Sequence, residues 1–186
     1  MPDPVSHPYD ALTPDTILDS LEAIGLHPDG GMLALNSYEN RVYQIGIDDD
    51  LPMVAKFYRP GRWSDEAILE EHRFSIDLQS EEIPIIAPLS IADRTLHEHG
   101  GFRFSLFPRR GGRWPELDSP DNLEWIGRFL ARIHQIGASS PFSARSTISP
   151  GRLGDDSARY LLDVFVLPLE IESRYKIGRA SCRERV

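Results

Sequence analysis

The sequence is poor in cysteine, in long apolar runs and in positive charge. Its 186 residues include one cysteine, Cys182, which cannot form an internal disulfide or a cysteine-based metal site. No stretch approaches the roughly 20 consecutive apolar residues that cross a bilayer, and the opening MPDPVSHPYD has no secretory pattern. Acidic residues outnumber basic ones by 29 to 20, which argues against nucleic-acid and anionic-membrane partners. We therefore expect a cytoplasmic protein that binds neither nucleic acid nor membrane.

The pattern of apolar residues predicts an α+β fold. Two segments show helical periodicity with a capping residue at the start, 12–26 and 61–82. Short β-type runs bounded by turn residues predict five strands, two of them within 32–47 and the others at 53–57, 83–93 and 100–108. This order favours an antiparallel five-stranded sheet covered by one helix.

Composition predicts two lobes joined by a linker. The linker RRGGRWPELD is rich in glycine and arginine, and a helix beginning at Ser119 and Pro120 follows it. The predicted divisions are an N-terminal helical segment (1–30), a sheet lobe (31–108), the linker (109–118), the first helices of a second lobe (119–176) and a tail (177–186).

Lys56 is the residue that needs an explanation. It lies in MVAKFYRP, a run that otherwise reads as a buried strand, and burying an ammonium among apolar neighbours is costly unless an anion meets it. The following helix offers Glu70 and Glu71, and an external phosphate is a second possible anion. From periodicity alone, a lysine that reaches solvent at a sheet edge accounts equally well for the pattern.

Several longer strings narrow the choice. LNSYENRVYQ, VAKFYRPGRWS, ILEEHRFS, IIAPL and GRFLARIHQ occur in this order within residues 12–176. Together they resemble the bacterial stress response kinases, serine/threonine protein kinases built on the aminoglycoside and choline phosphotransferase variant of the kinase fold. The resemblance implies a kinase-like N-lobe followed by the start of a helical C-lobe.

The resemblance also implies roles for individual residues. Lys56 would contact the α and β phosphates of ATP, with Glu71 as its partner. The turn NSYEN would cover the phosphates, with Ser37 near ATP, although it lacks the glycines of ordinary protein kinases. Backbone groups near Leu106, Phe107 and Arg109 would meet the adenine edge at the hinge. ATP and Mg²⁺ would be the cofactors, and the complete protein would be a monomer that phosphorylates protein serine or threonine hydroxyls and protects against oxidative or envelope stress.

The catalytic half of the family pattern is absent from the sequence. Related kinases carry an H-G-D-x-H-x-x-N-like loop and a D-x-D-D-like strand, and neither string occurs here. We therefore expect no catalytic base and no metal ligand in this chain, and no phosphoryl transfer by the chain alone. Two alternatives stay open: a fragment of a kinase for small molecules such as choline, aminoglycosides or homoserine, and a module that binds ATP without using it.

The last ten residues, IGRASCRERV, have a composition unlike the preceding helix. The codons ATC GGA AGA GCG TCG TGT AGG GAA AGA GTG encode them and reproduce a widely used short-read sequencing adapter. The adapter begins with AG before ATC, which requires a codon ending in AG for the preceding residue, and Lys176 fits. We therefore expect residues 177–186 to be translated adapter and the coding sequence to be truncated at Lys176.

Overall fold

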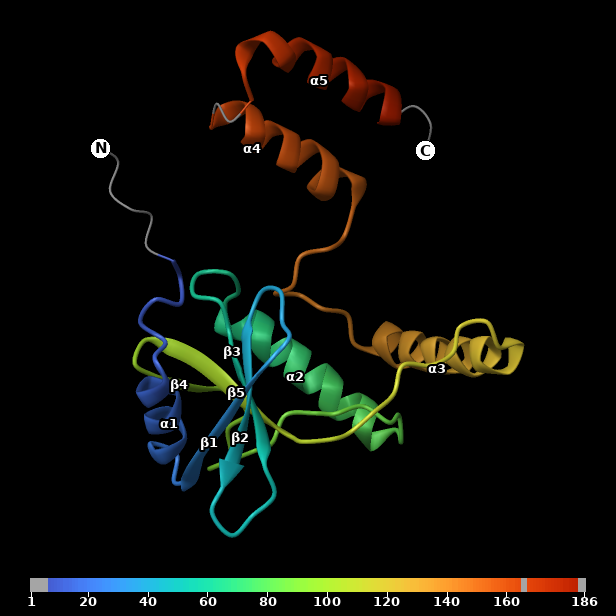
Figure 1. Cartoon of the computed structure of the whole chain (residues 1–186). Coiled ribbons are helices and arrows are strands. Elements are labelled where there is room, and N and C mark those ends of the chain that lie inside the picture. Colours follow the sequence, from blue (N-terminus) through green and yellow to red (C-terminus); the bar gives the residue numbers. More distant parts are fainter. Residues whose placement is uncertain (1–6, 165–166, 184–186) are drawn as a thin grey trace. The chain divides into compact units, whose positions relative to one another are not determined.

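The computed structural model describes residues 7–164 and 167–183 (Figure 1). The chain divides into two compact units, Met1–Ala144 and Arg145–Val186, and each is described by itself. The first unit contains the sheet and three helices. The second contains a single-turn segment Gly151–Asp156 (η1) and the helices α4 (Ser157–Asp163) and α5 (Leu169–Arg183). Helix α5 includes residues 177–183 of the tail that we expect to be adapter, and residues 184–186 lie outside the described residues.

The first unit is built on the predicted five-stranded antiparallel sheet. The strands, in spatial order, are β1 (Pro28–Leu35), β2 (Arg41–Ile47), β3 (Met53–Phe57), β5 (Phe102–Pro108) and β4 (His97–His99). Every neighbouring pair is antiparallel. Strand β3 is central, so Lys56 lies opposite Val42 of β2 on one side and Ser105 of β5 on the other.

The position of one strand was predicted wrongly. Residues 83–93 form no strand, and β4 instead lies in the segment that was predicted to be a turn. Pro84 and Pro88 remove two backbone donors from the expected strand, and its contact with the sheet is the bond from Leu89 N–H to the Leu106 carbonyl (2.7 Å). The actual hairpin turns at Gly100 and Gly101, whose positive φ angles of 57° and 80° suit a tight two-residue turn.

Helices cover both faces of the sheet. Helix α1 (Pro14–Glu22) begins at Thr13, whose hydroxyl accepts from Thr16 N–H, and buries Ile17 and Leu21 against one face. That face also buries Ala55, Phe57, Phe104 and Leu106. Because side chains alternate along a strand, Val54 and Lys56 point to the opposite face, where α2 (Asp65–Ser80) lies. The covering helix predicted from the sequence is α2, and α1 adds a second layer (Figure 1).

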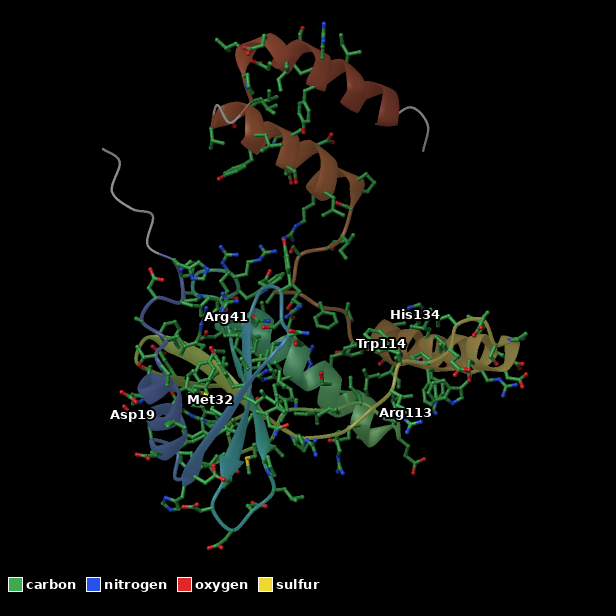
Figure 2. The ribbon with its side chains drawn as sticks, viewed as in Figure 1. Asp19, Met32, Arg41, Arg113, Trp114 and His134 are labelled. Atoms are coloured by element: carbon green, nitrogen blue, oxygen red, sulfur yellow. The ribbon has the colours of Figure 1, made fainter. Side chains whose placement is uncertain are left out.

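Helix α3 (Pro120–Ser139) belongs to the same compact unit as the sheet. It begins after Ser119, as predicted, and follows a linker in which Arg113 and Trp114 lie outside any helix or strand (Figure 2). Trp114 is 96% exposed, so it takes no part in the core. Across the parts of the chain that the structure describes, no helix is both long and apolar enough to cross a membrane.

Candidate functional site

A cavity of about 420 Å³ opens on the α2 face of the sheet. Its walls combine an apolar group of residues from the strands and from the segment after α2, namely Val42, Val54, Ile85, Ile86, Phe107 and Pro108. Four polar side chains complete the lining: Lys56, Glu71, Ser75 and Arg110. Apolar walls with a few convergent polar groups are the usual composition of a small-molecule site.

An ion pair between Lys56 and Glu71 lies at the polar end of this cavity. The Lys56 Nζ atom is 3.0 Å from Glu71 Oε1, and the two side chains are 21% and 34% exposed. The ammonium also lies 4.8 Å from the centre of the Tyr58 ring. An ammonium has three donors, so after pairing with Glu71 it can still donate to an anion in the cavity. The geometry therefore places a fixed positive charge beside an apolar slot.

The two candidate carboxylates of α2 have different partners. Glu71 meets Lys56, whereas Glu70 is 8% exposed and accepts hydrogen bonds from the segment after α3. Consecutive residues on a helix point about 100° apart, so the two side chains cannot both face the cavity. The structure thus forms the pair that the sequence analysis expects.

A hydrogen bond from the Ser37 side chain closes the turn between β1 and β2. The Ser37 hydroxyl donates to the Asn40 carbonyl at 2.7 Å, which closes the turn without glycine. The Ser37 side chain is exposed and does not line the cavity. Tyr38 at the tip is also fully exposed.

Glu39 ties this turn to the loop after β3. Its carboxylate accepts from Arg62 Nε (2.9 Å) and Trp63 Nε1 (2.9 Å), while Asn40 Oδ1 accepts from Arg59 N–H (3.4 Å). The hydrogen bond from Arg62 is the main reason that the pKa of Glu39 is lowered, against the opposing effect of burial. The two unusual strings NSYEN and RPGRW are therefore bonded to each other, which replaces glycine-based turn geometry with side-chain ties.

Tyr9 reaches the same turn from the N-terminal segment. Its hydroxyl donates to the Glu39 carbonyl at 3.0 Å and lies 3.4 Å from the Phe57 carbonyl. The guanidinium of Arg41, labelled in Figure 2, lies 4.6 Å from the centre of the Tyr9 ring. Burial raises the pKa of Tyr9 to about 12. The role of Tyr9 was not predictable from the sequence, because 30 positions separate it from Glu39 and no local pattern links them.

Of the six residues predicted to bind nucleotide, the structure brings three together at the cavity: Lys56, Glu71 and Phe107. The Leu106 side chain is buried on the opposite face, and its carbonyl already accepts from Leu89. Arg109 bonds Gln44 through Nε (3.2 Å), and the neighbouring Arg110 lines the cavity instead. Ser37, as described above, lies outside the lining.

Seven lining residues were missed: Val42, Val54, Ser75, Ile85, Ile86, Pro108 and Arg110. The strand period of two would have identified Val54, which lies on the same face as Lys56, and the helix spacing would have identified Ser75, four residues after Glu71. Within the residues that the structure describes, no group of three or more His, Cys, Asp or Glu side chains could hold a metal ion. With Lys56 and Arg110 beside apolar walls, the lining suits a partly apolar molecule with an anionic group.

The comparisons with known proteins agree with this geometry. The profile of the phosphotransferase enzyme family matches residues 32–173, which includes the cavity and the ion pair.

The chain is also similar to curated kinases. It is 41% identical to stress response kinase A of Escherichia coli (strain K12) over 167 residues, which is 90% of this chain and 51% of the relative. Over 140 residues it is 46% identical to stress response kinase A of Salmonella choleraesuis (strain SC-B67) and to the serine/threonine protein kinase RdoA of Salmonella typhimurium (strain LT2), covering 75% of this chain and 43% of each relative. The chain therefore spans about half the length of these relatives.

A solved structure shares the fold. Amicoumacin kinase hAmiN, in complex with AMP-PNP, Ca²⁺ and Ami, matches with a TM-score of 0.55 and 18% sequence identity. The match covers 69% of this chain and 41% of that protein.

Proposed function

Because this chain belongs to the phosphotransferase enzyme family, we propose that it binds ATP in the cavity beside β3, as the nucleotide-binding part of a protein kinase. The observation that carries the proposal is the Lys56–Glu71 pair, 3.0 Å long, at the polar end of an apolar slot. The complete protein would transfer the γ-phosphate of ATP to serine or threonine hydroxyls of proteins. The names of the relatives support this acceptor class and a role in stress response.

Each part of the site has a task in this proposal. The apolar walls from Val42, Val54 and Phe107 would hold the adenine ring, and Lys56 would donate to the phosphates. Glu71 would keep the ammonium oriented during nucleotide exchange, because without a phosphate the lysine would otherwise be free to turn away. Arg110, at the rim, could add a second positive charge beside the nucleotide.

Magnesium would shield the phosphate charges in the complete kinase. Among the described residues, no group of three or more His, Cys, Asp or Glu side chains is suited to hold it. The related amicoumacin kinase structure contains AMP-PNP and Ca²⁺, which agrees with the use of a nucleotide and a divalent metal. We propose that the chain binds ATP in the cytoplasm and that residues outside 1–176 supply the base and the metal ligands.

Thermal unfolding with ATP and magnesium chloride tests the proposal. A ligand at one hundred times its Kd stabilises the folded state by about 2.7 kcal/mol, so the midpoint should rise by several degrees. Lys56→Ala should abolish most of this shift while leaving the unliganded midpoint within a few degrees of the parent chain. Arg73→Ala, a change on α2 outside the cavity lining, is the matched control and should retain the shift. No shift at millimolar ATP in the unaltered chain would contradict the proposal.

A further inference from the structure

Glu70 is a buried carboxylate that the proposed ATP site does not use. It neighbours Glu71 on α2 and is 8% exposed. Charged side chains are seldom buried to this extent without partners, because the loss of hydration must be compensated by hydrogen bonds. The partners of Glu70 therefore indicate what the residue does.

These partners include Ser143 and Ala144, which lie in the segment after helix α3. Glu70 Oε1 accepts from Ser143 N–H and from Ser143 Oγ, both at 2.7 Å, and Oε2 accepts from Ala144 N–H at 2.8 Å. Hydrogen bonds to a carboxylate are roughly twice as strong as neutral ones. Two of the donors are backbone groups, so the contact depends on the path of the main chain at residues 143–144.

Further contacts extend this attachment along α2. The Phe74 and Phe142 rings meet edge to face at 5.4 Å, and Phe74 also lies 3.5 Å from the position where a Cβ on Gly137 would be. At the far end, Arg132 Nη2 donates to the Glu81 carbonyl (2.9 Å), which caps the C-terminus of α2. Residues 132–144 thus run antiparallel to α2, over about 16 Å of helix. We call this contact the α2–α3 seam.

We propose that Glu70 is a positioning residue that sets the rotation of α2 and, through it, the reach of Glu71 to Lys56. Glu70 and Glu71 are held about 100° apart by the helix, so any rotation of α2 carries both carboxylates together. While residues 143–144 hold Glu70, Glu71 is held against the lysine. Releasing Glu70 lets α2 rotate about its axis and weakens the Lys56–Glu71 pair. The consequence for ATP affinity rests on the proposed function, whereas the coupling of the two carboxylates does not.

The chain provides a direct probe of the ion pair. Lys56 and Lys176 are its only lysines, and they lie in different compact units. A brief pulse of N-hydroxysuccinimidyl acetate, read by mass spectrometry, gives the acetylation rate of Lys56 relative to Lys176 in one sample. The Lys56 ammonium must leave Glu71 and lose a proton before its nitrogen can attack the ester carbonyl and release N-hydroxysuccinimide, so the rate reports how firmly the pair is held.

The variants separate positioning from simple stabilisation. Glu70→Gln should raise the acetylation rate of Lys56, relative to that of Lys176, by about threefold or more. The new amide presents a donor to the Ala144 N–H group, so this hydrogen bond is lost and α2 is held less firmly. Ser143→Ala removes only the hydroxyl donor to Glu70 and keeps the two backbone donors, so it should give a smaller rise. Glu71→Gln, which breaks the pair directly, sets the upper limit. Glu66→Gln makes the same chemical change at an exposed position of α2 and should change nothing.

The outcomes distinguish this inference from the proposed function. If Glu70→Gln lowers the unfolding midpoint but leaves the Lys56 rate at the parent value, Glu70 is a purely structural residue and the inference is wrong. The acetylation assay contains no nucleotide, so a parent chain that fails to bind ATP would overturn the proposed function without deciding this result. If the chain binds ATP and Glu70 also positions Glu71, the Kd for ATP should rise by about threefold to tenfold in Glu70→Gln. This rise should parallel the rise in the acetylation rate of Lys56.

Discussion

The alternation of side chains along strand β3 determines which face Lys56 points to, and helix α2 positions its partner Glu71. Ala55 and Phe57 face the buried core, so Lys56 must face the cavity, and a glutamate at 71 can reach it from α2. This arrangement was predictable, because it depends on spacings of two residues in a strand and of turns in a helix. The task of Glu70 was not, because its partner Ser143 lies 73 positions away, in the segment after α3.

His97 is a second residue whose burial has a testable effect. It is 8% exposed, and within the described part of the chain its Nε2 atom has no hydrogen-bond partner. Burial lowers the pKa of His97, with the guanidinium of Arg94 adding to the effect and a hydrogen bond to the Arg94 backbone opposing it. In the folded protein the imidazole therefore stays neutral at pH values where the unfolded chain is already protonated.

The sign of the pH effect follows from linkage. Below the unfolded value of 6.5 the unfolded chain binds a proton that folded His97 does not, so His97 makes the protein less stable as the pH falls from 6.5 towards the lower folded pKa. We expect His97→Gln to reduce the loss of unfolding free energy between about pH 7.5 and about pH 5.5, as measured by urea unfolding. His99→Gln, in the same strand, is the control. Equal slopes in the parent and His97→Gln chains would show that His97 titrates normally in the fold.

At the scale of elements, the β1–β2 turn is stabilised by side-chain hydrogen bonds, most of them to other segments, rather than by glycine geometry in its own backbone. Ordinary kinase turns use glycine to approach the phosphates, whereas this turn is tied to the loop after β3 through Glu39 and to the N-terminal segment through Tyr9. Two of the five strings that carry the family resemblance, those containing NSYEN and RPGRW, are thus bonded to each other. Their contact could not be derived from either string alone, because it links positions more than 20 residues apart.

Tyr9→Phe tests the role of this support. The change removes the hydrogen bond to the Glu39 carbonyl and should lower the unfolding free energy by about 1 kcal/mol. If the turn covers the phosphates, ATP affinity should also fall by about threefold or more, as measured by titration calorimetry. Tyr43→Phe, on the neighbouring strand β2, is the matched control. A stability loss with unchanged ATP affinity would separate the turn from the nucleotide.

The misplaced strand shows where local patterns fail. Residues 83–93 are as apolar as a strand, but the two prolines prevent regular pairing, and several of these residues serve other surfaces, such as Ile85 and Ile86 in the cavity wall. The true edge strand β4 contains two histidines and a glutamate and is specified by its glycine turn. The number of strands and the antiparallel sheet were predictable from the sequence. The choice of β4 in place of residues 83–93 was not, because it depends on tertiary contacts.

At the scale of the whole molecule, the chain consists of two compact units, and the candidate ATP site lies entirely within the first. We therefore expect a nucleotide to protect or label Lys56 and to leave Lys176 unaffected. Lys56 lines the cavity, whereas Lys176 lies on α5, where it pairs with Glu172. Lys176 therefore serves as the internal control in each measurement that labels lysines.

The most direct test of the central claim is affinity labelling with an acyl phosphate of ATP. A lysine amine beside the bound phosphates attacks the acyl carbonyl, an amide forms, and ATP leaves. We expect Lys56 to be acylated much faster than Lys176, excess ATP to suppress the labelling of Lys56, and Glu71→Gln to reduce that labelling. Equal labelling of the two lysines, unaffected by ATP, would contradict the claim that this cavity binds ATP through Lys56.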